Sequence, residues 1–147
     1  MQVIEVIENK KDYIELLLLA DEQEDMIDRY LDRGKMYVID DNGIKCECVV
    51  TNEGNGILEI KNIATVTEYQ GRGYAKFLIE FIAKKYKGKY KILQVGTGDS
   101  LSTIPFYENC GFVRSHIIPN FFTDNYVNPI YDNGVQLVDM VYLRRAL

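Results

Sequence analysis

Residues 70–76 read QGRGYAK and join an apolar strand to an amphipathic helix. The strand, residues 57–66, alternates apolar and polar side chains, whereas the helix, residues 73–86, has a helical period. Gly71 and Gly73 permit a tight turn, so backbone amides at the start of the helix can point at one anion, supported by the helix dipole. The segment therefore predicts either a pyrophosphate cradle or only a compact connection.

Two other glycine motifs do not fit this segment. A dinucleotide fingerprint needs a third glycine or an alanine where this chain has Lys76. A nucleoside-triphosphate loop needs Gly-Lys followed by Ser or Thr, which neither this turn nor residues 96–103 contain. The sequence thus argues against both kinds of nucleotide site.

The rest of the chain places short strands and helices around this unit, with a hairpin turn at Asp41, Asn42 and Gly43. We expect one mixed α/β domain over residues 1–147. The helix over 73–86 is expected to face the core with Phe77, Leu78, Phe81, Ile82 and Tyr86. The expected elements are a strand over 3–7, helices over 12–20 and 22–33, strands over 36–39, 44–50 and 57–66, a helix over 73–86, a strand over 92–95, a helix over 101–109, and strands over 112–118 and 135–143.

Composition limits the partners and the compartment. The net charge of −5 argues against a general nucleic-acid binder, because such proteins cluster Lys and Arg. Three cysteines without zinc-site spacing predict a cytoplasmic protein with no structural metal or disulfide. The longest apolar run, residues 14–20, contains Glu15 and is shorter than the ~20 residues of a membrane span, so neither membrane insertion nor export is expected. The solvated side of the second helix is expected to carry Asp21, Glu22, Glu24, Asp25, Asp28 and Asp32.

The glycine turn also resembles a known family motif. Gln70, Gly73 and Ala75 fit Gln-x-x-Gly-x-Ala, the acetyl-CoA pyrophosphate motif of the GCN5-related N-acetyltransferase (GNAT) superfamily. The expected order of elements is similar to that family over nearly the full chain. The resemblance implies a mostly antiparallel sheet, in which strands four and five form a splayed parallel pair with pantetheine between them. A second matching segment has an aromatic residue, a tyrosine and then Gly-Phe, and comprises Phe106, Tyr107, Cys110, Gly111 and Phe112.

The C-terminal segment resembles a more particular group, small bacterial GNAT acetyltransferases of which some are named indole-acetate acetyltransferases. That name identifies no substrate, because an acid offers no amine to acetylate. The residues that carry this resemblance are Asn120, Phe121, Phe122, Thr123, Asp124, Asn125, Tyr126, Pro129, Ile130, Asn133, Gly134, Asp139 and Met140.

The resemblance implies acetyl-CoA as the acetyl donor and no metal. Strand four would lie beside pantetheine, the turn amides would hold the pyrophosphate, Gln70 would shape the loop and Arg72 would add charge at its rim. Many relatives carry an Asn seven residues before the motif tyrosine, where this chain has Ser100 in the polar segment 96–100. Its hydroxyl can replace that contact, or the segment only turns the chain. The expected donor-binding residues are Ile63, Ala64, Thr65, Gln70, Gly71, Arg72, Gly73, Tyr74, Ala75, Lys76 and Ser100.

Tyr107 matches the family's general acid, which protonates the departing CoA thiolate. Without the family motif, a tyrosine beside Phe106 on a short helix is typical of a core residue. Glu59, on the strand before the glycine turn, is the candidate general base, with a solvated edge carboxylate as the alternative. His116 is interpreted as a surface or hydrogen-bonded core residue.

The aromatic segment after the sixth strand is where this fold commonly builds its acceptor pocket. We expect Phe121, Phe122, Asp124 and Tyr126 to contact the acceptor there. Aromatic rings and an acidic chain suit a cationic small-molecule amine. The alternative is a hydrophobic lid or a contact between two copies of the chain in a homodimer.

Three functions remain open at this point. The leading one is acetyl-CoA-dependent N-acetyl transfer to a small primary amine by direct attack on the thioester. The second is acetylation of a protein N-terminus or lysine, which needs an open groove. The third is a catalytically silent acyl-CoA-binding or interaction module, suggested by the unassigned base and by Ser100.

Overall fold

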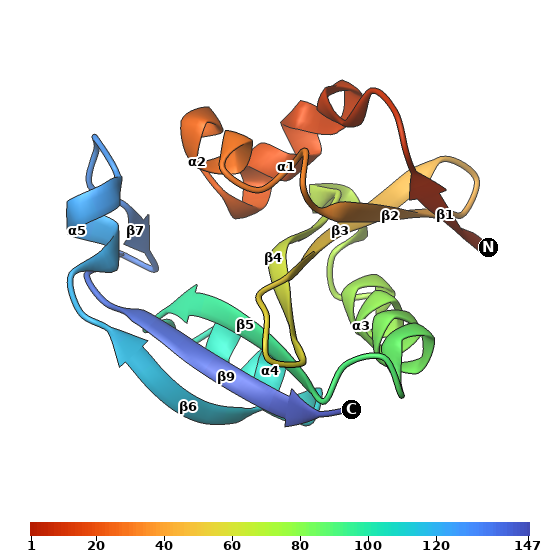
Figure 1. Cartoon of the computed structure of the whole chain (residues 1–147). Helices are drawn as coiled ribbons and strands as arrows, with labels where there is room; N and C mark the ends of the chain where they lie inside the picture. Colours follow the sequence, from red (N-terminus) through yellow and green to blue (C-terminus); the bar gives the residue numbers. More distant parts are fainter.

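The computed structural model describes residues 1–147 and contains one seven-stranded sheet with helices on both faces (Figure 1). The strand order is β1-β2-β3-β4-β5-β9-β6, and every neighbouring pair is antiparallel except β4 and β5. The strands of this sheet are β1 Gln2–Val6, β2 Lys35–Asp40, β3 Ile44–Asn52, β4 Ile57–Thr65, β5 Ile92–Gly98, β6 Val113–Ile118 and β9 Met140–Ala146. A separate hairpin pairs β7 Tyr131–Asp132 with β8 Val135–Gln136.

Five α-helices accompany the sheet, and α3 is the longest with 13 residues. None of the helices combines the length and the apolar character needed to cross a membrane. The helices are α1 Ile14–Ala20, α2 Glu24–Asp28, α3 Tyr74–Tyr86, α4 Thr103–Asn109 and α5 Phe121–Asn125, and short 3-10 turns occupy Lys10–Tyr13 and Thr67–Tyr69.

Alternate side chains of the central strands divide the core into two layers. On β2, Tyr37 and Ile39 belong to the cluster that contains α3 and α4, whereas Met36 and Val38 pack with α1 and α2. This follows from strand geometry, which turns successive side chains to opposite faces. Figure 1 accordingly shows α1 and α2 on one side of β2 and β3 and α3 on the other.

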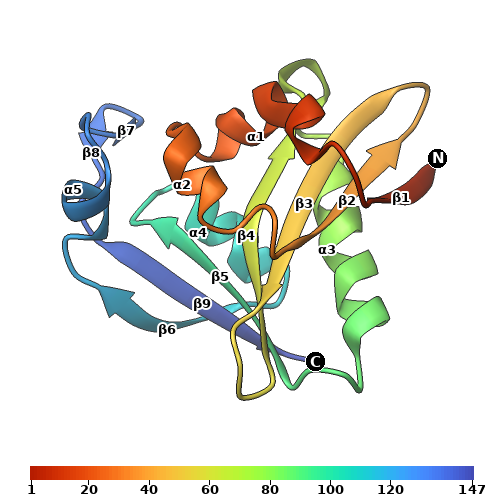
Figure 2. The ribbon, with the colours of Figure 1, turned by 45° about the horizontal axis from the view of Figure 1, so that its top comes forward.

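The centre of the sheet splits between β4 and β5. These strands pair only from Ile57 to Ile60 on β4, while β4 continues to pair with β3 and β5 with β9. Figure 2 shows the two strands starting side by side and then diverging. A bulge marks the divergence, because Val50 faces Ile60 and Val49 faces Asn62, which leaves Lys61 without a partner on β3. The split leaves the β5-facing edge of β4 free over its last five residues.

The predicted mixed α/β fold, with its parallel pair at strands four and five, is confirmed. The prediction that residues 96–100 form a loop is wrong for the first three, because β5 runs to Gly98 and pairs there with β9. A side chain at Gly96 would place its Cβ 2.7 Å from the Met140 sulfur, and one at Gly98 would place it 2.6 Å from a Leu137 methyl group. These glycines permit close packing within a strand rather than a turn.

Two helix expectations are also wrong. The second helix ends at Asp28 rather than at residue 33, and the chain continues through turns that bury Tyr30 and Leu31. On α3, Leu78, Ile82 and Tyr86 are buried as expected, but Phe77 is 45% exposed, and Ile79 and Ala83 are buried in its place. The side of α3 that packs on the sheet is therefore displaced slightly, away from Phe77 and toward Ile79 and Ala83.

Candidate active site

The split between β4 and β5 opens into a cleft of about 400 Å³, called here the donor cleft. Its walls come from the end of β4, the turn before α3, the start of α3, and α4. It brings together most of the residues expected to bind the acetyl donor, namely Ile63, Ala64, Thr65, Gln70, Gly71, Gly73, Tyr74, Ala75 and Lys76.

The glycine turn has the backbone that an anion cradle requires. Gly71 has a φ of 78° and Gly73 a φ of 90°, a left-handed backbone conformation that residues other than glycine rarely adopt. A Cβ added at either position would meet no atom within 4 Å, so the turn faces open space rather than packed protein. Gly73 is the residue immediately before α3, whose first amides and dipole therefore point into the cleft.

Polar and cationic groups surround this turn. The Gln70 side chain donates to the carbonyl of Thr65 at 3.3 Å, which ties the loop to the end of β4. Arg72 lies outside the cleft lining, with its guanidinium 5.1 Å from the centre of the Tyr69 ring. Lys45 lies over the same ring at 4.1 Å, so two cations flank the entrance.

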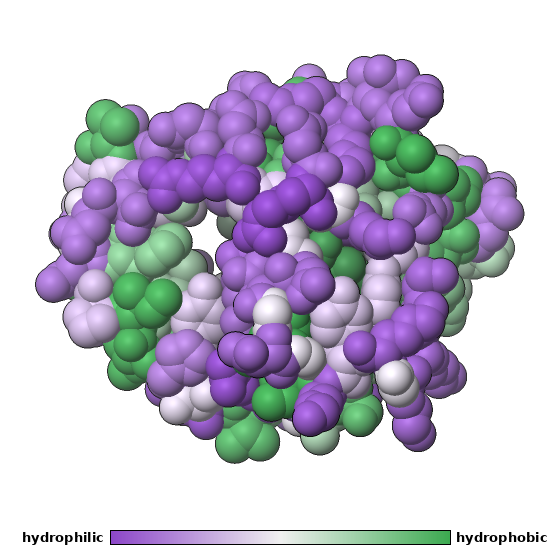
Figure 3. Space-filling view, in the orientation of Figure 1, coloured by the Kyte–Doolittle hydropathy of each residue, from purple (hydrophilic) through white to green (hydrophobic).

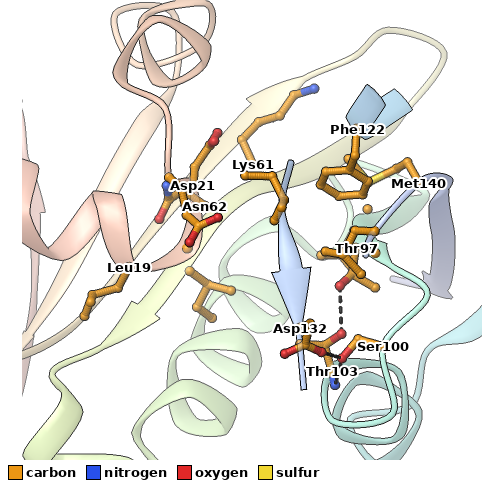
Figure 4. Close-up of a pocket in the computed structure, with 18 of the residues that line it drawn as sticks. Leu19, Asp21, Lys61, Asn62, Thr97, Ser100, Thr103, Phe122, Asp132 and Met140 are labelled. Atoms are coloured by element: carbon orange, nitrogen blue, oxygen red, sulfur yellow. Dashed lines mark hydrogen bonds between the residues drawn. The ribbon is translucent and has the colours of Figure 1, made fainter. Parts of the chain in front are cut away.

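A second cavity of about 380 Å³, called here the acceptor cavity, adjoins the donor cleft. Four residues line both spaces: Leu19, Ile63, Thr103 and Tyr107. The other walls come from the α1–α2 turn, β5, α5 and β7 (Figure 4). Figure 3 shows an opening through the molecule, bounded by these elements.

Tyr107 stands where the two spaces meet. Its ring packs edge-on against Phe106 and Phe112, with ring centres 5.2 and 5.8 Å away. The residue is 7% exposed, and burial raises the pKa of its hydroxyl, so that the group stays protonated at neutral pH. The Tyr107 ring thus packs in the core, and the same side chain lines both cavities.

Glu59 is buried, 4% exposed, and lies beside the acceptor cavity rather than in it. Lys61 pairs with its Oε2 at 2.8 Å and Tyr142 donates to the same oxygen at 3.3 Å, while Gln94 donates to Oε1 at 2.5 Å. It lines a smaller cavity of about 170 Å³, which shares Lys61 with the acceptor cavity. The alternative of a solvated edge carboxylate is therefore wrong.

Ser100 lines the acceptor cavity and not the donor cleft. Its Oγ accepts hydrogen bonds from the backbone amides of Ser102 and Thr103 at 3.1 and 3.3 Å, and its hydroxyl bonds to Asp132 on β7. The side chain therefore organises the start of α4 and ties it to the β7–β8 hairpin.

The residues expected to bind the acceptor fall in different places. Phe122 and Tyr126 line the acceptor cavity, whereas Phe121 lines the smaller neighbouring cavity. Asp124 is exposed and lines none of these spaces. The two rings at 122 and 126 stack with centres 5.6 Å apart.

Asp21 is a cavity residue that sequence reasoning missed. It was expected on a solvated helix side, yet it follows the last residue of α1, is half-buried, and lines the acceptor cavity. The Tyr126 hydroxyl donates to its Oδ1 at 2.7 Å and the Tyr30 hydroxyl to its Oδ2 at 3.1 Å. One signal was available, because this acid ends the apolar run 14–20 and so lies between two helices.

The remaining candidates for chemistry lie away from the cavities. His116 is exposed and stacks on Tyr142 with ring centres 4.7 Å apart, as expected for a surface histidine. Burial raises the pKa of the thiols of Cys46, Cys48 and Cys110, which keeps them in the unreactive protonated form.

Comparison with known proteins agrees with this architecture. Residues 32–114 match the family model described as acetyltransferase (GNAT) domain. The chain is 35% identical over 139 residues, 92% of its length and 90% of the relative's, to the uncharacterized N-acetyltransferase YvbK of Bacillus subtilis (strain 168).

Solved structures match the whole fold. A GNAT family acetyltransferase from Elizabethkingia anophelis, solved with acetyl-CoA bound, is 35% identical with a TM-score of 0.93, covering 99% of this chain and 97% of that one. An IAA acetyltransferase from Bacillus cereus ATCC 14579 is 33% identical with a TM-score of 0.90, covering 99% and 100%. These matches define the class of protein, an acetyltransferase of the GNAT fold. With the family model matching more than half of its residues, the chain belongs to the GNAT superfamily and is an N-acetyltransferase.

Proposed function

We propose that this N-acetyltransferase moves the acetyl group of acetyl-CoA to a primary amine of a small molecule by direct attack on the thioester. The observation that carries the proposal is the meeting of the donor cleft and the acceptor cavity at Tyr107. A reaction between two substrates needs such a junction, because holding both in place supplies much of the rate.

The donor cleft fits acetyl-CoA. The open space over Gly71 and Gly73 leaves room for a pyrophosphate against the amides that begin α3. The free edge of β4, from Ile63 to Thr65, offers backbone groups to the amides of an extended pantetheine arm. A similar protein supports the assignment, since a Bacillus subtilis acetyltransferase, 32% identical with a TM-score of 0.89 and covering 99% of this chain and 98% of that one, was solved in complex with CoA.

Few groups take part in the acetyl transfer. The thioester of the bound donor supplies the acetyl group. A β4 amide beside the cleft polarises the thioester carbonyl, and Tyr107 donates its proton to the departing sulfur. Burial raises the pKa of the Tyr107 hydroxyl and so keeps its proton in place at neutral pH, where the O–H is available to the departing sulfur.

We assign Glu59 as the carboxylate that receives the proton of the attacking amine. Glu59 does not line the acceptor cavity, so the proton must reach it along a path through an intervening group rather than by direct contact. The smaller cavity that Glu59 lines adjoins the acceptor cavity, and the residues shared by the two are Asp21, Ile60, Lys61, Gly96, Tyr126 and Met140. The ion pair with Lys61 keeps the carboxylate oriented along that path.

A small acceptor is favoured over a protein. The α5 segment reaches across to the α1–α2 turn, where Gln23 donates to the Asn125 carbonyl at 3.3 Å and accepts from the Val127 amide at 2.9 Å. This connection closes the side of the acceptor cavity, whereas a peptide substrate needs a groove that is open along its length.

Thiol release tests the proposal. Purified protein is incubated with acetyl-CoA and a panel of primary amines, and free CoA thiol and acetylated amine are measured together. We expect thiol release that requires an amine and matches the acetylated product. Acetylation of peptides but not of free amines would favour the protein substrate, and acetyl-CoA binding without thiol release would favour the silent module.

A further inference from the structure

We propose that Asp21 binds a second, protonated nitrogen of the acceptor, so that the acceptor is a diamine rather than a simple monoamine. This inference rests on the proposed acetylation of a small amine and adds the substrate class. Asp21 lies in the wall of the acceptor cavity, at the turn between α1 and α2 (Figure 4).

Tyrosine hydroxyls from two other parts of the chain hold the Asp21 carboxylate. Tyr126, from the segment after β6, donates to Oδ1 at 2.7 Å, and Tyr30, from the segment after α2, donates to Oδ2 at 3.1 Å. Tyr30 is itself fixed, because the Asn62 amide at the β4 bulge donates to its hydroxyl at 3.0 Å. Two neutral donors orient the carboxylate and leave its charge in place.

The charge of Asp21 has no partner in the protein. The structure holds no ion pair to this residue, although it is half-buried. The single cation that lines the acceptor cavity, Lys61, pairs with Glu59 at 2.8 Å. Asp21 also lines the smaller cavity, together with Arg29 and Arg33, but neither of these cations pairs with it. Arg29 donates to Asn125 at 3.1 Å, and Arg33 pairs with Glu53 at 3.0 Å.

Each nearby cation is thus engaged elsewhere, and none forms the ion pair that a half-buried carboxylate favours. Burial raises the pKa of Asp21, and the nearby Asp25 acts in the same direction. Glu22 and Asp132 also line the cavity and add negative charge. A bound ammonium supplies the missing positive charge.

The ammonium at Asp21 is not the nitrogen that reacts. A carboxylate stabilises the protonated amine, whereas the attacking nitrogen must be unprotonated. The acceptor cavity meets the donor cleft at Leu19, Ile63, Thr103 and Tyr107, and Asp21 does not line the donor cleft. One nitrogen of the acceptor therefore binds Asp21 and a second nitrogen attacks the thioester. The stacked rings of Phe122 and Tyr126 offer an apolar wall to the methylene chain that joins the two nitrogens.

The test compares two amines of equal length, 1,5-diaminopentane and 1-aminopentane, by kcat/KM for thiol release. We expect the wild-type protein to prefer the diamine by about tenfold or more, the effect of one charge-assisted contact. Asp21→Asn keeps the shape but removes the charge, and should bring the ratio close to one. Asp32→Asn removes the same charge from the exposed end of the same acidic run and should keep the wild-type ratio.

Each failure has its own signature. A wild-type ratio near one, or an unchanged ratio in Asp21→Asn, overturns the role of Asp21 while leaving amine acetylation intact. Acetylation of other amines but of neither pentyl compound also overturns it. Absence of thiol release with every amine overturns the proposed function itself. If Asp21→Asn fails to fold, the wild-type ratio alone decides, because it needs no variant.

Discussion

The hydroxyl of Tyr126 donates a 2.7 Å hydrogen bond to Asp21, which lies 105 residues earlier in the chain. With the two contacts of Gln23 to the same segment, this bond fastens α5 to the α1–α2 turn across the acceptor cavity. Arg29 adds another contact across this connection in the cavity wall, donating to Asn125 at 3.1 Å.

Tyr126→Phe should loosen that wall. The change removes a hydrogen bond to a charged acceptor, a contribution of about 1.5–3 kcal/mol, and leaves the ring packing against Phe122. We expect faster amide hydrogen exchange over residues 120–138 and a higher KM for the acceptor, with acetyl-CoA affinity unchanged. Exchange as slow as in the wild-type protein would show that the contacts of Gln23 suffice.

Tyr107→Phe should lower turnover by about 10²–10⁴-fold, the range for one proton-transfer group. The Phe ring keeps the packing on Phe106 and Phe112, so acetyl-CoA affinity should stay the same. Steady-state kinetics with calorimetry of donor binding checks both. Tyr90→Phe, at a tyrosine outside both cavities, is the control, and equal activity in the two variants would remove Tyr107 from catalysis.

Gly73→Asp should abolish acetyl-CoA binding, because it puts a carboxylate into the space over the start of α3. Gly54→Asp is a matched control, since Gly54 also has a positive φ, 83°, faces open space and lies in the β3–β4 turn. Both variants should lose about 1–2 kcal/mol of stability from the left-handed backbone. Calorimetry should show normal binding only in Gly54→Asp; binding in both would contradict the anion cradle.

Glu59→Gln should lower kcat/KM, with acetyl-CoA affinity unchanged, if this carboxylate receives the amine proton. A structural role alone predicts a lower melting temperature with kcat/KM little changed in the protein that remains folded, since Lys61 would lose its buried partner. Glu53→Gln, which disturbs the same lysine from 3.9 Å away, is the control for that effect.

Glu47→Gln should change how stability depends on pH. Glu47 is fully buried on β3, and neither carboxylate oxygen has a hydrogen-bond partner, so burial raises its pKa well above the usual 4.5. The folded state then holds a proton that the unfolded state releases, and the free energy of unfolding falls as the pH rises above that usual value. Thermal unfolding between pH 5 and 8 should show a smaller loss in Glu47→Gln than in the wild type, whereas Glu68→Gln, at an exposed position, should show none of this difference.

Much of the fold could be predicted because its signals are local. The hairpin turn at Asn42 and Gly43 has positive φ values of 55° and 107°, as Asn and Gly predict. The glycine turn before α3 was likewise visible in the sequence, and the structure puts it in the donor cleft.

What sequence reasoning missed depends on distant partners. Gly96 and Gly98 lie in a strand because β9, more than 40 residues later, pairs with them and crowds their Cα atoms. In the sequence, Asp21 looks like the exposed acids beside it, and only the fold brings the Tyr126 hydroxyl into contact with it. The position of Ser100 likewise follows from its bond to Asp132, which no local pattern shows.

The acceptor cavity has walls of its own, from the α1–α2 turn, β5, α5 and β7, and Figure 3 shows an opening in the molecule; in the proposed reaction the acceptor would enter there, apart from the donor cleft. If the proposed reaction holds, a bound donor would not block the acceptor, and both would occupy the protein at once in a ternary complex. The order of events would then be sequential: neither product would have to depart before the second substrate arrives, and the protein itself would never carry the acyl group.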